Sequence, residues 1–287
     1  MFSKLLKHDM RSIGRYWWII AVSTLGLSLV GAFAFRFILE TSMNDFEYPV
    51  FTILAMLILI GCYLGVIASV IITEILVFLR FYKNFFTDEG YLTFTLPVSR
   101  KSLLASKTVN AFIWTLAQVF LLLFCIIFIF GTISTPMSEG SGIINPVLLV
   151  SIGDFFIEAW KSVGAWVIVY VIEALVMVGL STLFSISLAH FCITFGSVIA
   201  KKHKLLAAIG IYYVTNMVLS FITQIAAILG MAIIGSLYDA DGYYSAVYDI
   251  NPVIAVLLLI VIAVMAVLAI VMYRLTLRQL ERKLNLP

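Results

Sequence analysis

The sequence predicts an all-α polytopic membrane protein with six transmembrane helices and both termini in the cytoplasm. Composition, six long apolar runs and the distribution of charge lead to this fold class. Of the 287 residues, 63% are hydrophobic and 11% are charged, whereas a soluble domain is about 45–50% apolar and about 25% charged. One soluble core cannot hide this much apolar surface, so part of the solvent must be lipid.

Six apolar runs are long enough to cross a bilayer, which takes about 20 residues of helix. They lie at residues 17–39, 50–79, 109–133, 163–200, 205–237 and 252–273. None alternates polar and apolar residues as a transmembrane β-strand does, and a helix then remains to satisfy the backbone in lipid. We expect one membrane domain over residues 1–287, because no segment between spans is long enough for a soluble core of its own.

The basic residues predict the orientation. Sixteen of the 18 Lys and Arg residues lie in the N-terminal segment, between spans two and three, between spans four and five, and after span six. The positive-inside bias places these segments in the cytoplasm. The sequence therefore predicts a cytoplasmic loop at residues 80–107 and an extracellular loop at 134–162. A net charge of +3 is too small to indicate a nucleic-acid partner.

Residues 1–16 are predicted to form an amphipathic helix in the lipid headgroup plane. An apolar stripe and a basic face both recur at helical spacing. The stripe contains Phe2, Leu6, Met10, Ile13 and Trp17, and the basic face contains Lys4, Lys7, Arg11 and Arg15. Such a helix either only fixes orientation or moves with a transport machinery.

The loop at residues 80–107 is predicted to be helical in two pieces. Thr87 suits the N-cap of a short helix whose first turn holds Asp88 and Glu89, where the helix dipole favours acids. Pro97 ends that helix, since the residue before proline avoids the helical region. Ser99 then suits the N-cap of a helix that continues through Lys101 and Lys107 into the third span.

The same loop is rich in aromatic residues. They are Phe81, Tyr82, Phe85, Phe86, Tyr91 and Phe94. Aromatic side chains at this density suit anchoring in the pocket of a partner protein or lying among lipid headgroups. The residues by themselves leave both interpretations open.

At this point the chain resembles a known family, the six-span membrane subunits of type 2 ATP-binding-cassette exporters, particularly the short permeases of Gram-positive bacteria. The most specific part is the string Asp88-Glu89-Gly90-Tyr91-Leu92 followed by Leu96-Pro97. Supporting parts are Phe81-Tyr82-Lys83-Asn84, Thr87, Thr93-Phe94-Thr95, Val98, Ser102-Leu103-Leu104-Ala105-Ser106-Lys107, Lys202-His203-Lys204 and Lys283-Leu284-Asn285-Leu286.

The resemblance implies that the short helix in this loop is a coupling helix that docks on a separate ATPase subunit. It thereby favours partner binding for the aromatic residues. The implied ATPase-coupling residues are Phe81, Tyr82, Phe85, Phe86, Thr87, Asp88, Glu89, Gly90, Tyr91, Phe94 and Pro97. It also implies a second permease chain, identical or homologous, and a bacterial cytoplasmic membrane as the location.

No catalytic motif supports an enzyme. The chain lacks GxxxxGK[ST], HExxH and GxSxG, so no P-loop is present to cradle phosphates. Its three cysteines lie in apolar runs without the spacing of a metal site. We expect no catalytic residue, no metal and no cofactor in this chain, with ATP and Mg²⁺ bound by the partner ATPase.

Ionisable groups inside spans are costly, so they usually have a partner or face water. Glu74 lies near the inner end of the second span, where we expect a pair with a basic residue of the loop. Glu173 lies deeper in the fourth span. It either pairs with Arg36, near the outer end of the first span, or faces a cavity that receives a cation.

Small and polar residues within the spans have two interpretations each. Gly61, Gly65 and Ser69 form a row that allows close helix approach, within this chain or against a second permease. The scattered polar residues are Asn110, Thr115, Gln118, Thr215, Asn216, Thr223 and Gln224. They either line a pathway or make hydrogen bonds between helices.

Two functional hypotheses follow from these observations. In the first, the chain is the permease of an ATP-driven exporter that moves an amphiphilic or hydrophobic substrate, such as a peptide, a lipid or a drug. In the second, it is a non-transporting scaffold or immunity factor that binds an amphiphilic peptide or a partner protein. An intramembrane enzyme is a third class with little support, since no motif points to it.

Overall fold

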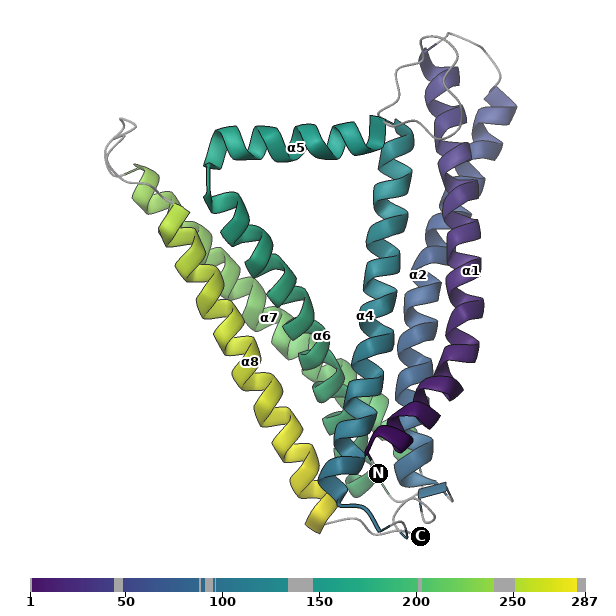
Figure 1. The fold of residues 1–287 in the computed structure, drawn as a ribbon, viewed down its shortest axis with the longest axis vertical. Coiled ribbons are helices and arrows are strands. Elements are labelled where there is room, and N and C mark those ends of the chain that lie inside the picture. The colour runs from purple at the N-terminus through teal and green to yellow at the C-terminus, as the bar shows by residue number, and fades with distance from the viewer. Residues whose placement is uncertain are drawn as a thin grey trace. The chain divides into compact units, whose positions relative to one another are not determined.

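The computed structural model describes residues 2–43, 49–87, 89–90, 95, 97–133, 147–200, 203–239 and 251–282. These residues form seven helices, shown in Figure 1. The helices are α1 (Phe2–Met43), α2 (Pro49–Phe86), α4 (Arg100–Ile133), α5 (Val147–Val163), α6 (Trp166–Ile199), α7 (Lys204–Asp239) and α8 (Asn251–Arg282).

Six of these helices are long and apolar enough to cross a membrane. The qualifying segments are Leu5–Thr41, Pro49–Phe86, Arg100–Ile129, Trp166–Ile199, Lys204–Ala232 and Asn251–Glu281. Each contains one predicted span or most of it, so the prediction of an all-helical, multi-pass membrane protein is confirmed. Many large apolar side chains on these helices are exposed, including Leu57, Ile60 and Val264, as lipid contact requires. The cytoplasmic position of the termini stays a prediction.

The segment predicted as an extracellular loop contains the helix α5, which the sequence analysis did not anticipate. At 17 residues this helix is shorter than a span needs. It ends at Val163, and α6 begins at Trp166. Gly164 between them has a φ of +63°, a conformation that a residue with a Cβ adopts only at a cost. This glycine therefore separates α5 from α6, close to the predicted start of the fourth span at residue 163.

The predicted N-terminal helix is present but is not a separate element. It continues without a break into the first span as α1. Ile13 and Trp17 from the predicted apolar stripe are buried, while Lys7, Arg11 and Arg15 are exposed. The two faces are therefore arranged as the spacing predicts for these residues. Their position in the headgroup plane remains a prediction.

The chain divides into two compact units, and the single membrane domain expected over residues 1–287 stays a prediction. The first contains Met1–Arg80 and Ala105–Val167, and the second contains Phe81–Leu104 and Ile168–Pro287. Three helices contribute to both units, because α2 continues past Arg80 to Phe86, α4 begins at Arg100, and α6 begins at Trp166. The end of α2 and the start of α4 thus belong to the unit that contains most of α6 and all of α7 and α8.

In the first unit, α1, α2 and α4 lie side by side (Figure 1). A Cβ on Gly65 would lie 2.6 Å from Cδ1 of Leu27 in α1, which makes this a close helix approach. Nε2 of Gln118 in α4 donates to Oγ of Ser69 at 3.1 Å, and the side chains of Gln118 and Thr73 meet at 3.4 Å. Two members of the predicted small-residue row therefore contact helices of the same chain. A Cβ on Gly61 would meet nothing within 4 Å among the described residues.

In the second unit, α6 contacts both α7 and α8. A Cβ on Gly196 would lie 2.6 Å from the backbone of Ala208 in α7. The Tyr170 hydroxyl in α6 lies 3.0 Å from Oδ1 of Asn251 at the start of α8. In α7, Thr215 and Asn216 donate to the carbonyls of Ile211 and Tyr212 in their own helix, and the Thr215 side chain also forms a hydrogen bond with Cys192 in α6. Gln118 and Thr215 are thus members of the scattered polar set that link two helices by a side-chain pair.

Candidate functional site

The candidate site is the segment Phe81–Leu104, which we call the elbow. It contains the end of α2, the start of α4 and the residues between them, and it belongs to the second unit. It also contains the residues that carry the family resemblance. Asp88, Tyr91 and Phe94 from the predicted coupling set lie outside the described residues.

Three aromatic side chains of the elbow are buried. Phe81, Phe85 and Phe86 have ring centroids 4.9 to 6.4 Å apart, the separation at which aromatic rings attract one another. The ring of Phe81 also stacks on the buried ring of His190 in α6, with centroids 3.8 Å apart and planes inclined by 17°. The end of α2 is therefore fixed to α6 by an aromatic cluster.

This burial changes the interpretation of the aromatic residues. The expectation was that they anchor in the pocket of a partner, but the rings of Phe81, Phe85 and Phe86 are enclosed within the chain. Phe81 and Phe85 are four residues apart and therefore share one helix face, against which α6 places the ring of His190. Tyr82 is half-buried and stacks on Phe86 at 6.0 Å. Among the described aromatic residues of the elbow, it is the one with an accessible ring.

A second link joins the elbow to α8. Nη1 of Arg100 donates to the carbonyl oxygens of Leu280 at 2.6 Å and of Glu281 at 2.9 Å. These carbonyls belong to the last turn of α8, where no backbone N–H within the helix is left to pair with them and the helix dipole favours a cation. Arg100 thus caps α8 from the first residue of α4. Leu280, Leu103 and Leu104 are buried in the same unit.

Ser99 caps the start of α4, as the sequence predicts. The backbone N–H of Ser102 donates to Oγ of Ser99 at 3.3 Å, and the N–H of Leu103 donates to the Ser99 carbonyl at 3.1 Å. A serine three residues ahead of the N–H that it accepts from is the usual N-cap geometry. The helix then runs through Lys101 and Lys107 to Ile133, so this prediction is confirmed.

The turn after α2 depends on a glycine. The Thr87 hydroxyl donates to the Lys83 carbonyl at 2.6 Å, and the Thr87 carbonyl accepts the N–H of Gly90 at 2.7 Å. A Cβ on Gly90 would lie 2.7 Å from the backbone oxygen of Phe85. Gly90 is therefore needed for close backbone approach. Glu89 and Gly90 are helical, as is Thr95.

The exposed surface of the elbow is polar in its described part. Lys83, Glu89, Pro97 and Lys101 are exposed, and Thr87 is half-buried. A charged and accessible rim around a buried aromatic cluster suits a segment that is held by its own chain on one side and meets another molecule on the other.

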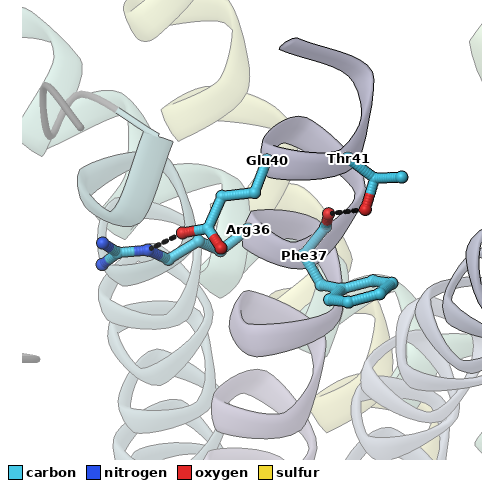
Figure 2. Close-up of polar contacts among 4 residues, drawn as sticks. All are labelled: Arg36, Phe37, Glu40 and Thr41. Atoms are coloured by element: carbon cyan, nitrogen blue, oxygen red, sulfur yellow. Dashed lines mark hydrogen bonds and ion pairs between the residues drawn. The ribbon is translucent and has the colours of Figure 1, made fainter. Parts of the chain in front are cut away.

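Arg36, one of the predicted intramembrane charges, has a partner in its own helix. Its Nε lies 3.0 Å from Oε1 of Glu40 in α1, as Figure 2 shows. Glu74 is half-buried, and no ion pair joins it to another residue that the structure describes. Its pairing with a loop residue and the pairing of Arg36 with Glu173 stay predictions.

Glu173 is buried in α6 with 5% of its surface exposed. Neither carboxylate oxygen has a hydrogen-bond partner among the described residues. A charged carboxylate inside a span costs at least about 2.5–3.5 kcal/mol on insertion scales. A buried carboxylate without a described partner is therefore a candidate for a functional role.

Sequence reasoning missed a buried ion pair in the first unit. Nζ of Lys107 in α4 donates to Oδ2 of Asp9 in α1 at 2.6 Å, and the two side chains are 10% and 4% exposed. Asp9 interrupts a strongly basic segment, and this interruption was the available signal. The ring of Trp114, which lies 5.1 Å from that of Trp17, adds an aromatic contact between the same helices.

The described residues contain no group of three or more His, Cys, Asp or Glu side chains that could hold a metal ion. Cys62, Cys125 and Cys192 are buried and not in disulfides. Neither protein-family models, nor curated proteins, nor solved structures gave a match to this chain.

Proposed function

We propose that this chain is the membrane-embedded permease subunit of an ATP-driven exporter of the ATP-binding-cassette class, located in a bacterial cytoplasmic membrane. The observation that carries the proposal is the elbow. A segment between the second and third apolar helices is packed firmly on α6 and capped onto α8, yet keeps Lys83 and Lys101 exposed. The resemblance of its sequence to a coupling helix supports the same conclusion.

In this proposal the elbow receives force from a cytoplasmic ATPase. The ATPase holds ATP and Mg²⁺, and its closure pushes the exposed rim of the elbow. Because Phe81 stacks on His190 and Arg100 caps the last turn of α8, the push reaches α6 and α8 directly. Because the elbow joins the second and third spans, these contacts extend the transmission beyond them to the fourth and sixth spans.

A second permease chain, identical or homologous, completes the transport path. Large apolar side chains are exposed on α2, α6 and α8. A second chain can pack against such surfaces, so the six helices of one chain do not have to enclose the path alone. Substrates that partition into lipid suit such apolar walls, so the substrate class is amphiphilic or hydrophobic.

The experiment is reconstitution with a co-expressed ATP-binding-cassette ATPase in nanodiscs. We expect the permease to co-purify with the ATPase and to stimulate ATP hydrolysis. Reversing both exposed lysines of the elbow, Lys83→Glu with Lys101→Glu, should reduce that stimulation by about tenfold or more, since charges at an interface set encounter and register.

The matched control reverses two exposed basic residues of α1, Arg11→Glu with Arg15→Glu. We expect this variant to keep ATPase stimulation. Equal stimulation by the wild type and the elbow variant would contradict the proposal. Co-purification with a partner that has no ATPase would favour a scaffold or immunity role instead.

A further inference from the structure

Glu173 is a buried group of α6 to which the proposed function gives no role. It lies seven residues after Trp166, the first residue of α6, or about 10 Å along the helix at 1.5 Å per residue. Its side chain is 5% exposed, and no described residue donates a hydrogen bond to either carboxylate oxygen. Such a group in a membrane span needs a proton or a cation.

The chain offers few cations for this purpose. On the predicted outer side its basic residues are Arg36 and Lys161. Arg36 pairs with Glu40 in α1, and Lys161 is exposed on α5. The sequence stretches 44–48, 134–146 and 240–250 contain no Lys, Arg or His, so they have no basic side chain to supply.

The surroundings of Glu173 within the second unit suit an organic cation. Tyr170 lies three residues earlier and therefore on the same helix face. Its hydroxyl lies 3.0 Å from Oδ1 of Asn251 in α8, so a polar contact joins α6 to α8 on the outer side of Glu173. Inward of Glu173 the residues on this face, Met177 and Leu180, are apolar. A carboxylate between an aromatic ring and apolar side chains matches a cation that carries its own apolar surface.

We propose that Glu173 binds the positively charged group of a lipophilic cation, and that this defines the substrate class as cationic amphiphiles. The export role rests on the proposed function, whereas the binding site does not depend on an ATPase. The carboxylate supplies the counter-charge, and the surrounding span supplies the apolar contact. A neutral or anionic amphiphile of equal shape cannot make the charge interaction with the carboxylate.

The binding test uses the purified full-length chain in nanodiscs with no ATPase present. Tetraphenylphosphonium is the probe, and tetraphenylborate is its anionic counterpart of the same shape. We expect saturable binding of the cation, and we expect Glu173→Gln to weaken it by at least about tenfold. Glu173→Asp should retain part of the affinity, and Glu158→Gln, which changes an exposed carboxylate on α5, should retain all of it.

A second measurement uses the wild-type protein, so that it does not depend on a variant folding. Dicyclohexylcarbodiimide, a lipid-soluble reagent, adds to a protonated carboxylic acid to give an N-acylurea, which mass spectrometry locates. We expect modification at Glu173 that tetraphenylphosphonium slows and tetraphenylborate does not. Equal protection by both ions, or no protection by the cation, would overturn the proposal.

The two proposals fail in different ways. Loss of the Glu173 effect together with intact ATPase stimulation would remove the cation site and leave the exporter. Specific cation binding without any ATPase partner would remove the exporter and leave the site.

Discussion

At the scale of single residues, Gly90 shows how one missing side chain shapes the elbow. Its backbone lies so close to Phe85 that an added Cβ would be 2.7 Å from the Phe85 carbonyl oxygen. That atom belongs to the backbone and cannot rotate away, so the turn itself would have to move. Because Phe85 belongs to the aromatic cluster that fixes the elbow, the displacement would reach the contact with α6.

We therefore expect Gly90→Ala to lower the melting temperature by several degrees and to reduce ATPase stimulation. Gly179 in α6 is the matched control, because an added Cβ there meets nothing within 4 Å. Alanine is the better helix former by about 1 kcal/mol, so Gly179→Ala should leave stability equal or raise it. Thermal unfolding followed by fluorescence-detected size exclusion measures both. Equal melting temperatures for Gly90→Ala and the wild type would contradict the close approach.

The stacked pair of Phe81 and His190 is a second feature at the residue scale. A double-mutant cycle with Phe81→Leu and His190→Leu isolates the ring–ring contribution from general apolar packing. We expect a coupling energy of about 0.5–1.5 kcal/mol, obtained from unfolding in denaturant. A coupling energy indistinguishable from zero would mean that the two rings are neighbours without stabilising the elbow.

At the scale of elements, the N-terminal turns of α1 are held against α4 by a buried ion pair. The Lys107–Asp9 contact of 2.6 Å is shielded, whereas the Arg36–Glu40 pair is 34% and 43% exposed at its two side chains. Removing one partner of a buried pair leaves an uncompensated charge and costs about 3–5 kcal/mol. An exposed pair within one helix contributes about 0.3–0.5 kcal/mol.

These magnitudes predict different outcomes for the two ion pairs that involve α1. Asp9→Asn should destabilise the protein strongly, and adding Lys107→Met should recover part of the loss because the orphaned charge is removed. Glu40→Gln should have little effect on the melting temperature. The comparison is made by thermal unfolding in one detergent. If Asp9→Asn lowered the melting temperature no more than Glu40→Gln does, this result would contradict the role given to the Lys107–Asp9 pair.

At the scale of the whole molecule, the six apolar helices and the charge asymmetry make a topology prediction. Lys83 in the elbow and Asp154 on α5 are both exposed, and the positive-inside bias assigns them to opposite sides. Single cysteines at these positions, Lys83→Cys and Asp154→Cys, would be introduced after replacing Cys62, Cys125 and Cys192. We expect a membrane-impermeant maleimide to label Asp154→Cys in intact cells. It should label Lys83→Cys only after permeabilisation, and the reverse pattern would contradict both the orientation and the cytoplasmic elbow.

The sequence by itself determined the six apolar helices and the cap at Ser99. Both depend on local properties: the helices on the hydropathy of a continuous segment, and the cap on a serine that lies three residues before the backbone N–H it accepts from. It did not predict α5, since this helix of 17 residues is shorter than a span and contains Asp154, Glu158 and Lys161, so that its hydropathy did not distinguish it from a loop. The resemblance favoured a partner for the aromatic residues, three of which are buried in the chain, because a run of apolar rings does not show whether the face that carries them is exposed or enclosed.

Only the tertiary structure decided what the elbow contacts and which charges are paired. Arg100 donates to a carbonyl of α8 that lies 180 residues later, and Lys107 meets an aspartate 98 residues earlier. Phe81 finds His190 in another helix. Such pairs depend on which helix faces meet, and this is set by the packing of all the helices in a unit together. No local pattern contains that information, so the cap, the ion pair and the aromatic stack became visible only in the folded chain.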